Sequence, residues 1–149
     1  MPFKDCICFQ LGKTMRRVTK SYRQEIAAHG LTHGQFFMMV AIMEEEGLLP
    51  SELAQKTAQD RATTTGLLDR LEKEGWILRQ YREKDRRSHK IMLTPYAREK
   101  KEAILSLFEQ TNQKYLSSFS PEEWDQLQNF LGRLDLCDSL PPDTEPHKE

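Results

Sequence analysis

Hydrophobic residues recur at helical spacing in the first third of the chain. Steps of four, four, three, four and four residues separate Ile7, Leu11, Met15, Val18, Tyr22 and Ile26. This is the period of one face of an α-helix, so we expect a long helix over about 7–28 that ends near Gly30. The segment QFFMMVAIMEEE, from about 35 to 46, is apolar nearly all round and predicts a buried central helix.

The stretch that follows predicts two helices joined by a tight turn. A short helix starts at Pro50, and a second one is capped by Asp60 and ends at Gly75. The second helix turns its leucines toward the core, and its first turn presents Arg61, Ala62, Thr63, Thr64 and Thr65. We expect a helix-turn-helix here.

A hairpin and two more helices complete the pattern. WILRQY and HKIML read as short antiparallel strands, with the charged run REKDRR (82–87) at their tip. Thr94-Pro95 and Ser120-Pro121 are typical helix starts, and the tail 140–149 is expected to be disordered. The predicted fold class is mainly α with a small antiparallel β-wing: a winged helix-turn-helix of about six helices, in a single domain over 1–139.

Composition narrows the class of protein. With 149 residues and 38% hydrophobic content the chain suits one compact domain. It has no apolar run of about 18 residues and no secretory signal pattern, so we expect a cytoplasmic protein without a membrane partner.

Charge is distributed unevenly along the chain, although the net charge is only −1. Residues 79–90 hold six basic and two acidic side chains, a net charge of +4, whereas residues 121–149 have a net charge of −6. The middle of the chain is therefore the part suited to a polyanion.

The chemistry-bearing side chains argue against catalysis and metal binding. There is no glycine-rich phosphate loop, zinc-ligand spacing or nucleophile elbow, so we expect no enzyme activity and no cofactor. His29 and His33 are four residues apart, but Gly30 breaks the helix between them, and no metal site is expected. Cys6, Cys8 and Cys137 are odd in number and are expected to be reduced thiols.

The helix-turn-helix and the charged hairpin together indicate binding to double-stranded DNA. Small residues and an arginine at the start of a helix suit the major groove, and an arginine on a wing suits the minor groove. The candidate recognition-helix residues are Arg61, Ala62, Thr63, Thr64, Thr65 and Arg70. The candidate wing residues are Arg82, Lys84, Asp85, Arg86, Arg87, Ser88 and His89, with His89 expected to contact phosphate. The alternatives are a solvated hairpin tip and an ordinary exposed helix start.

At SELA, LLDRLEKEGWILR and DRRSHKIMLT the chain resembles winged-helix regulators of the MarR type, over residues 7 to about 136. The resemblance implies that the helix over 61–75 reads the major groove, while Asp85 holds the minor-groove residue Arg87. It also implies a homodimer whose helices over about 5–29 and 95–137 interlock, leaving about 35–94 as the winged helix. The resemblance implies that such a dimer acts as a repressor, and it would bind a near-palindromic operator with half-sites about 34 Å apart.

The resemblance also suggests how DNA binding is released. Cys8 and Tyr22 resemble the pair found in the organic hydroperoxide sensors (OhrR-like) of this family, although Gly12 stands where those sensors have a second tyrosine. Alternatively, Cys8 packs inertly and a small aromatic ligand is held near Arg16, Arg17 and Lys20, which are otherwise solvated. Cys6 and Cys137 are bystanders or resolving thiols. The alternative function is a non-specific architectural DNA-binding protein or a winged-helix protein-interaction module.

Overall fold

The computed structural model describes residues 2–82 and 85–137, and at positions 82, 85–87 and 137 it describes only the backbone. The elements in chain order are η1 (Phe3–Asp5), α1 (Ile7–Ala27), α2 (His33–Glu44), α3 (Pro50–Lys56), α4 (Arg61–Lys73), β1 (Ile77–Arg82), β2 (Asp85–Leu93), α5 (Pro95–Leu116) and α6 (Pro121–Cys137). The predicted mainly α fold with a β-wing is confirmed. The structure divides into two compact units within α5. One unit ends at Gln110 and the other begins at Thr111, and each is described by itself. The single domain over 1–139 stays a prediction.

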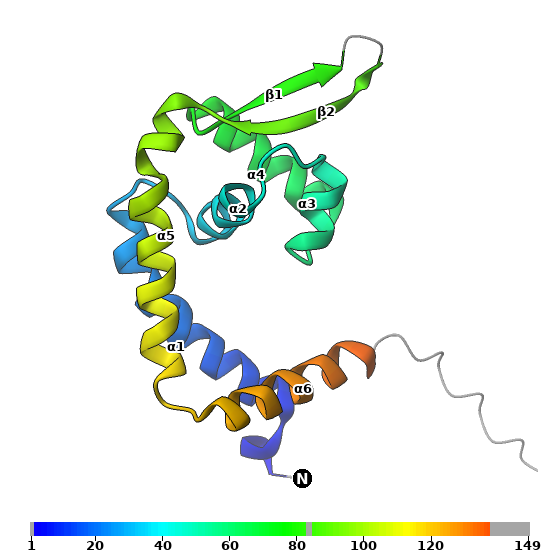
Figure 1. Ribbon diagram of the computed structural model, residues 1–149. Helices are drawn as coiled ribbons and strands as arrows, with labels where there is room; N and C mark the ends of the chain where they lie inside the picture. Colours follow the sequence, from blue (N-terminus) through cyan, green and yellow to red (C-terminus); the bar gives the residue numbers. More distant parts are fainter. Residues whose placement is uncertain (1, 83–84, 138–149) are drawn as a thin grey trace, which may run out of the picture. The chain divides into compact units, whose positions relative to one another are not determined.

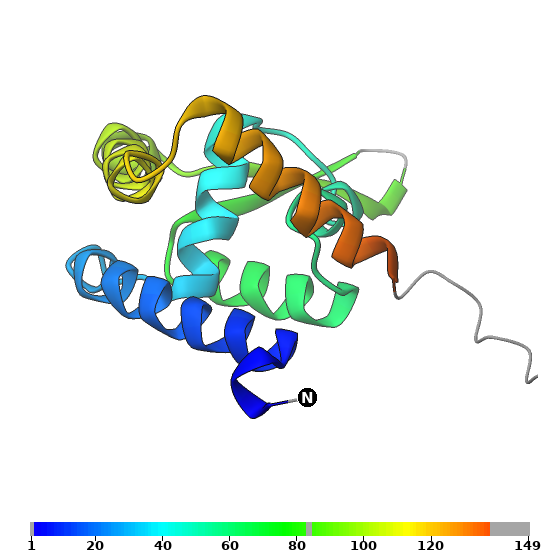
Figure 2. The same cartoon turned by 90° about the horizontal axis from the view of Figure 1, so that it is seen from below.

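The central helix α2 forms the core of the first unit. Its apolar residues from Phe36 to Met43 are buried apart from Phe37, which is half-buried. The helix contacts α1, α3, α4 and β2, which surround it in Figures 1 and 2. It starts two residues earlier than predicted because Thr32 and Gln35 form a reciprocal capping box.

The wing is a two-stranded antiparallel sheet. Its register pairs Ile77 with Leu93 and Tyr81 with His89, and the register shifts between Tyr81 and Arg82. Ile77, Ile91 and Leu93 are buried on one face of the sheet, whereas Leu78 on the other face is exposed. Tyr81, which is on the face of Ile77 but nearer the tip, is also exposed. The base of the wing is thus anchored in the core by the alternation of apolar residues.

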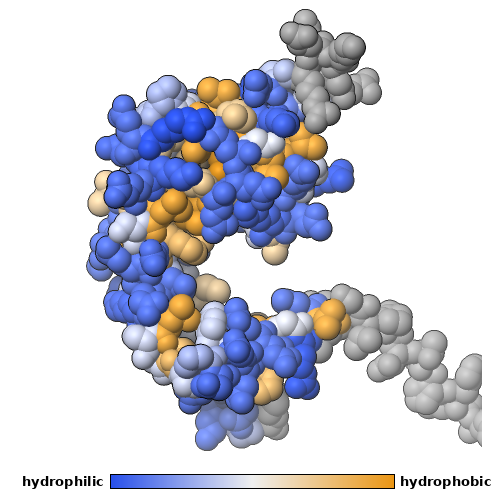
Figure 3. Space-filling view, in the orientation of Figure 1, coloured by the Kyte–Doolittle hydropathy of each residue, from blue (hydrophilic) through white to orange (hydrophobic). Residues whose placement is uncertain are grey.

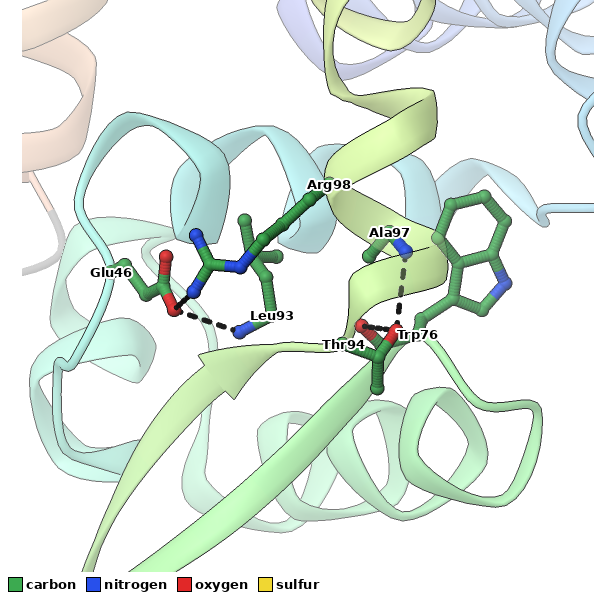
Figure 4. Close-up of polar contacts among 6 residues, drawn as sticks. All are labelled: Glu46, Trp76, Leu93, Thr94, Ala97 and Arg98. Atoms are coloured by element: carbon green, nitrogen blue, oxygen red, sulfur yellow. Dashed lines mark hydrogen bonds and ion pairs between the residues drawn. The ribbon is translucent and has the colours of Figure 1, made fainter.

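Polar contacts hold the base of the wing to the start of α5 (Figure 4). The Thr94 hydroxyl accepts a hydrogen bond from the Ala97 N–H at 3.1 Å and lies 3.2 Å from the Trp76 carbonyl oxygen. It also donates a hydrogen bond to the Gly75 carbonyl oxygen at 2.7 Å. Glu46 accepts hydrogen bonds from the Leu93 N–H at 3.2 Å and from the Arg98 guanidinium. The end of α2, the end of β2 and the first turn of α5 are therefore tied together by side chains.

The apolar stripe of α1 is only partly covered. Tyr22 and Ile26 are buried against the core, whereas Ile7, Leu11 and Met15 are about half exposed. On the side of the molecule seen in Figure 3, hydrophobic residues reach the surface as separate patches among hydrophilic ones. Among residues 2–82 and 85–137, no helix has the length and apolar character needed to cross a lipid bilayer.

In the second unit, Ser120 caps α6 through a hydrogen bond from the Glu123 N–H at 3.2 Å. Glu123 returns a contact to the Ser120 N–H at 2.8 Å, which completes a capping box. The helix has large exposed apolar residues at Phe130, Leu131 and Leu136. It therefore has an apolar surface that its own unit leaves uncovered.

Candidate nucleic-acid interface

The start of α4 is held by a strong N-cap. The Asp60 carboxylate accepts hydrogen bonds from the Thr63 backbone N–H and from the Thr63 hydroxyl, each at 2.7 Å. These bonds from Thr63 favour the charged carboxylate and lower the pKa of Asp60 below its usual value. The first turn of the helix is thus ordered before any ligand arrives.

Thr64 does not belong to the exposed surface, in contrast to the sequence prediction. Its side chain is only 1% exposed, and its hydroxyl donates to the Asp60 carbonyl oxygen at 2.9 Å. It continues the buried stripe of Leu67, Leu68 and Leu71, because positions three, four and seven residues on lie on the same helix face. The predicted exposure of Thr64 is therefore wrong, because the residue packs α4 onto the core, and a DNA contact from it stays a prediction.

The opposite face of α4 is exposed and has small side chains along its centre. Ala62 and Gly66 are one turn apart there, flanked on the helix surface by Arg61, Thr63, Thr65 and Arg70, all of which are exposed. A Cβ atom placed on Gly66 would meet no heavy atom within 4 Å. The packing of the protein therefore does not require glycine at this position.

A groove of about 450 Å³ lies beside the first turn of α4. Its lining comes from three elements and the residue before α3: Leu49, Pro50, Ser51, Arg61, Thr64, Thr65, Ser88 and His89. The Nε2 atom of His89 is buried and has no hydrogen-bond partner among the described residues. Arg61, Thr65, Ser88 and His89, predicted separately on the helix and on the wing, are thus brought together around one groove.

The structure describes only part of the wing tip. Lys84 is outside the described residues, and only the backbone is described for Arg82, Asp85, Arg86 and Arg87. Ser88 and His89 are half-buried in the middle of β2. The roles of the tip residues stay predictions.

Arg79 has a different environment from the one that its place in the basic stretch suggested. Its side chain is 14% exposed, and its Nη2 atom lies 2.6 Å from Asp69 Oδ1 of α4. Its Nη1 atom is paired with Glu72, also of α4. The guanidinium is turned toward the recognition helix rather than outward, so it does not add to the exposed positive charge.

Comparison with known proteins agrees with this geometry. The MarR family model matches residues 31–89, from the start of the helix-turn-helix lobe to the wing. The transcriptional regulator SarZ of Staphylococcus haemolyticus is 31% identical over 125 residues, which cover 84% of each chain. The transcriptional repressor YetL of Bacillus subtilis is 30% identical over 128 residues, covering 85% of this chain and 75% of YetL.

This chain belongs to the MarR family.

Solved structures of MarR-type regulators have the same fold. The transcriptional regulator SlyA superposes with a TM-score of 0.77 at 26% identity, covering 89% of this chain and 94% of SlyA. The DNA complex of MepR from Staphylococcus aureus also superposes with a TM-score of 0.77, at 22% identity, covering 87% of this chain and 95% of MepR. This MarR-family protein is a DNA-binding transcriptional regulator with a winged helix, and its relatives are regulators rather than enzymes.

The residues proposed for a thiol switch in this MarR-family chain lie in contrasting environments. Cys8 is exposed at the start of α1 in the single chain, and both of its interpretations, redox switch and inert packing, stay predictions. Tyr22 is 5% exposed, and its ring lies against the rings of Phe37 and His33, with centroids 5.5 and 6.4 Å away. A joint role of Cys8 and Tyr22 in a switch stays a prediction.

A second pocket, of about 360 Å³, lies between α2, α3 and α5 of the first unit. Its walls include His33, Phe37, Lys56, Gln59 and Phe108, and the Gln59 Oε1 atom is buried without a partner among the described residues. Burial and, secondarily, the charge of Arg23 lower the pKa of His33 below its usual value, so the imidazole is neutral at pH 7.

The residues predicted for ligand binding are not gathered in that pocket. Arg16, Arg17 and Lys20 are exposed on α1, and none of them lines it. Within the described ranges, no three His, Cys, Asp or Glu side chains are placed to hold a metal ion. The sequence analysis missed Gln59, because an isolated glutamine in a helix-turn-helix turn has no distinguishing pattern.

Proposed function

We propose that this MarR-family regulator is a homodimeric repressor that binds a near-palindromic operator and leaves it when an effector binds or a thiol is oxidised. The observation that carries the DNA-binding mode is the groove beside α4, which places Arg61 of the helix and His89 of the wing strand together. A guanidinium suits the phosphate backbone of DNA, and the half-buried His89 lines the same groove. YetL, which is 30% identical, is itself described as a repressor.

In this proposal α4 enters the major groove with its exposed face. Ala62 and Gly66 permit close approach to base edges, while Thr65 and Arg70 supply hydrogen-bonding groups on either side. Arg87, held by Asp85, reaches the minor groove at the tip of the wing, as the family resemblance implies. His89 and Arg61 contact the phosphates between these two points.

The dimer follows from uncovered apolar surface. Ile7, Leu11 and Met15 in the first unit and Phe130 and Leu131 in the second are exposed in a single chain. Apolar area of this kind is stabilised by burial against a partner, here a second copy. Two copies joined rigidly bind two half-sites about 34 Å apart, which raises affinity through effective concentration.

Effector release has two candidate routes. The first is a small aromatic acid or phenol in the pocket of Phe37 and Phe108, where Lys56 supplies a cation and Gln59 an unpartnered acceptor. The second is oxidation of the exposed Cys8 thiolate by an organic hydroperoxide to sulfenic acid, with release of the corresponding alcohol.

The decisive experiment is a fluorescence-anisotropy titration of the full-length protein with the DNA upstream of its own gene. A shuffled duplex of equal length, measured at the same salt concentration, is the specificity control. We expect Arg61→Ala to weaken operator binding by about 1–3 kcal/mol. Arg16→Ala, which removes the same charge from exposed α1, should leave affinity unchanged. Equal affinity for the two duplexes would favour the architectural alternative, and no binding to either would favour a protein-interaction module.

Two further titrations distinguish ligand binding from thiol oxidation as the cause of release from DNA. Cumene hydroperoxide should dissociate the wild-type complex and leave the Cys8→Ser complex bound if the thiol is the switch. A phenolic acid such as salicylate should dissociate wild type but not Phe108→Ala if the pocket is the switch. An operator complex that survives both agents would remove both routes.

A further inference from the structure

Arg79 lies between the two parts of the proposed DNA interface without facing DNA itself. It is the third residue of β1, and the next residues of the same strand lead to the pair Tyr81 and His89. Its side chain points to α4, where Asp69 and Glu72 are one helical turn apart. One guanidinium thus joins the wing strand to the recognition helix.

The contact is a fork from one cation to two carboxylates. Nη2 binds Asp69 Oδ1 at 2.6 Å and Nη1 binds Glu72, so both terminal nitrogens are occupied. Burial alone would lower the pKa of Arg79, but the hydrogen bond to Asp69 and the charge of Glu72 outweigh it and raise the pKa above the usual value. With 14% of its side chain exposed, Arg79 is poorly placed to reach a phosphate.

The two carboxylates are the exposed members of this cluster. Asp69 is 59% exposed and Glu72 40% exposed, both on α4 beyond the turn that holds Ala62 and Gly66. Unpaired negative charges beside the surface that approaches a DNA backbone would oppose binding. The described basic residues of α4 are Arg61, Arg70 and Lys73, so the balance of charge on this helix depends on whether the two carboxylates are neutralised.

We propose that Arg79 is a positioning residue of the DNA interface. It fixes β1, and through strand pairing His89, against α4, and it neutralises Asp69 and Glu72 beside the recognition surface. The inference rests on the proposed function, because it concerns how the operator-binding surface is assembled.

The test compares operator affinity of full-length variants in the anisotropy titration. Arg79→Met should weaken binding about tenfold, as loss of a supporting contact typically does. Lys13→Met is the charge control, because it also removes one cation, but from an exposed position of α1. The control should bind the operator as tightly as wild type. Circular dichroism and size-exclusion chromatography verify that each variant is folded and dimeric.

A triple variant distinguishes this role from a direct phosphate contact. Arg79→Met combined with Asp69→Asn and Glu72→Gln removes the cation and both repelling charges, and should regain most of the lost affinity with the wild-type salt slope. A persistent loss, together with a salt slope smaller by about 0.9, would mean that Arg79 contacts a phosphate directly and would overturn the proposal.

The remaining outcomes are equally distinct. If Arg79→Met does not fold, Arg79→Lys keeps the charge without the planar fork and should bind with intermediate affinity. Wild-type affinity in Arg79→Lys would overturn the positioning role. Wild-type affinity in Arg79→Met would overturn this inference and leave the proposed function standing. Failure of the wild-type protein to bind would overturn both.

Discussion

Gln35 and Glu74 are joined by a hydrogen bond of 2.8 Å between their side chains, from the first turn of α2 to the residue that ends α4. Gln35 is 2% exposed and also completes the capping box of α2. This contact therefore sets the end of the recognition helix against the central helix of the core.

The bond predicts a measurable loss of stability when its acceptor is removed. Glu74→Ala should lower the free energy of unfolding by about 1–3 kcal/mol, because it leaves the buried Gln35 amide without its partner. Urea denaturation measures the change. Glu99→Ala, at an exposed position of α5, should change stability by less than about 0.5 kcal/mol. Equal effects of the two variants would show that the contact contributes nothing to stability.

Gly66 should be a position where stability and DNA binding are opposed. Gly66→Ala is expected to raise the free energy of unfolding by about 0.5–1 kcal/mol, because alanine is the better helix former and the space around the site is open. Operator affinity should fall, because the methyl group occupies space between helix and bases. Gly132→Ala in α6, also in open space, should stabilise without this loss. Unchanged operator affinity in Gly66→Ala would show that residue 66 does not lie against the bases and that another part of α4 does.

Glycine at position 58 should relieve backbone strain in the turn of the helix-turn-helix. Ala58 has a backbone φ of 51°, in the left-handed region that disfavours residues with a Cβ. Ala58→Gly should therefore leave stability unchanged or raise it by up to about 1 kcal/mol, despite the entropy that glycine adds to the unfolded chain. Ala103→Gly in α5 is the control and should destabilise by about 0.5–1 kcal/mol. Similar losses at both positions in thermal and urea unfolding would show that the turn is unstrained.

The cap at Asp60 should make stability depend on acid pH. Hydrogen bonds from Thr63 lower the pKa of Asp60 in the folded protein below its usual value of 3.8. The unfolded chain therefore binds the proton more readily, so the stabilisation is fully present above pH 3.8 and is lost as the pH falls through the lower folded pKa.

Asp60→Asn provides the comparison, because asparagine also caps helices but does not titrate. Unfolding free energies of wild type and Asp60→Asn are measured by urea denaturation at pH 7, 4 and 3. As the pH falls, wild type should lose stability relative to Asp60→Asn. A difference that is constant with pH would mean that the cap does not depend on the carboxylate charge.

Local patterns along the chain were sufficient for the secondary structure and the fold class. The spacing from Ile7 to Ile26, the cap at Asp60 and the Thr94-Pro95 start all act over a few residues, so their signals are readable without tertiary structure. The family resemblance at DRRSHKIMLT and LLDRLEKEGWILR located the wing and the recognition helix for the same reason. These motifs are continuous in the chain.

The burial and contacts of individual side chains depend on segments distant in the sequence, and only the tertiary structure decided them. Thr63, Thr64 and Thr65 are equivalent by composition, but the packing of α4 on the core buries Thr64 and leaves its neighbours exposed. Arg79 belongs to a basic stretch of sequence, yet the fold places it beside two carboxylates of α4. The amino-acid sequence determines which helices and strands form, because hydrogen bonding and capping are local. Which side chains remain available to DNA depends on how those elements pack, since packing is what buries one residue of a run and exposes the next.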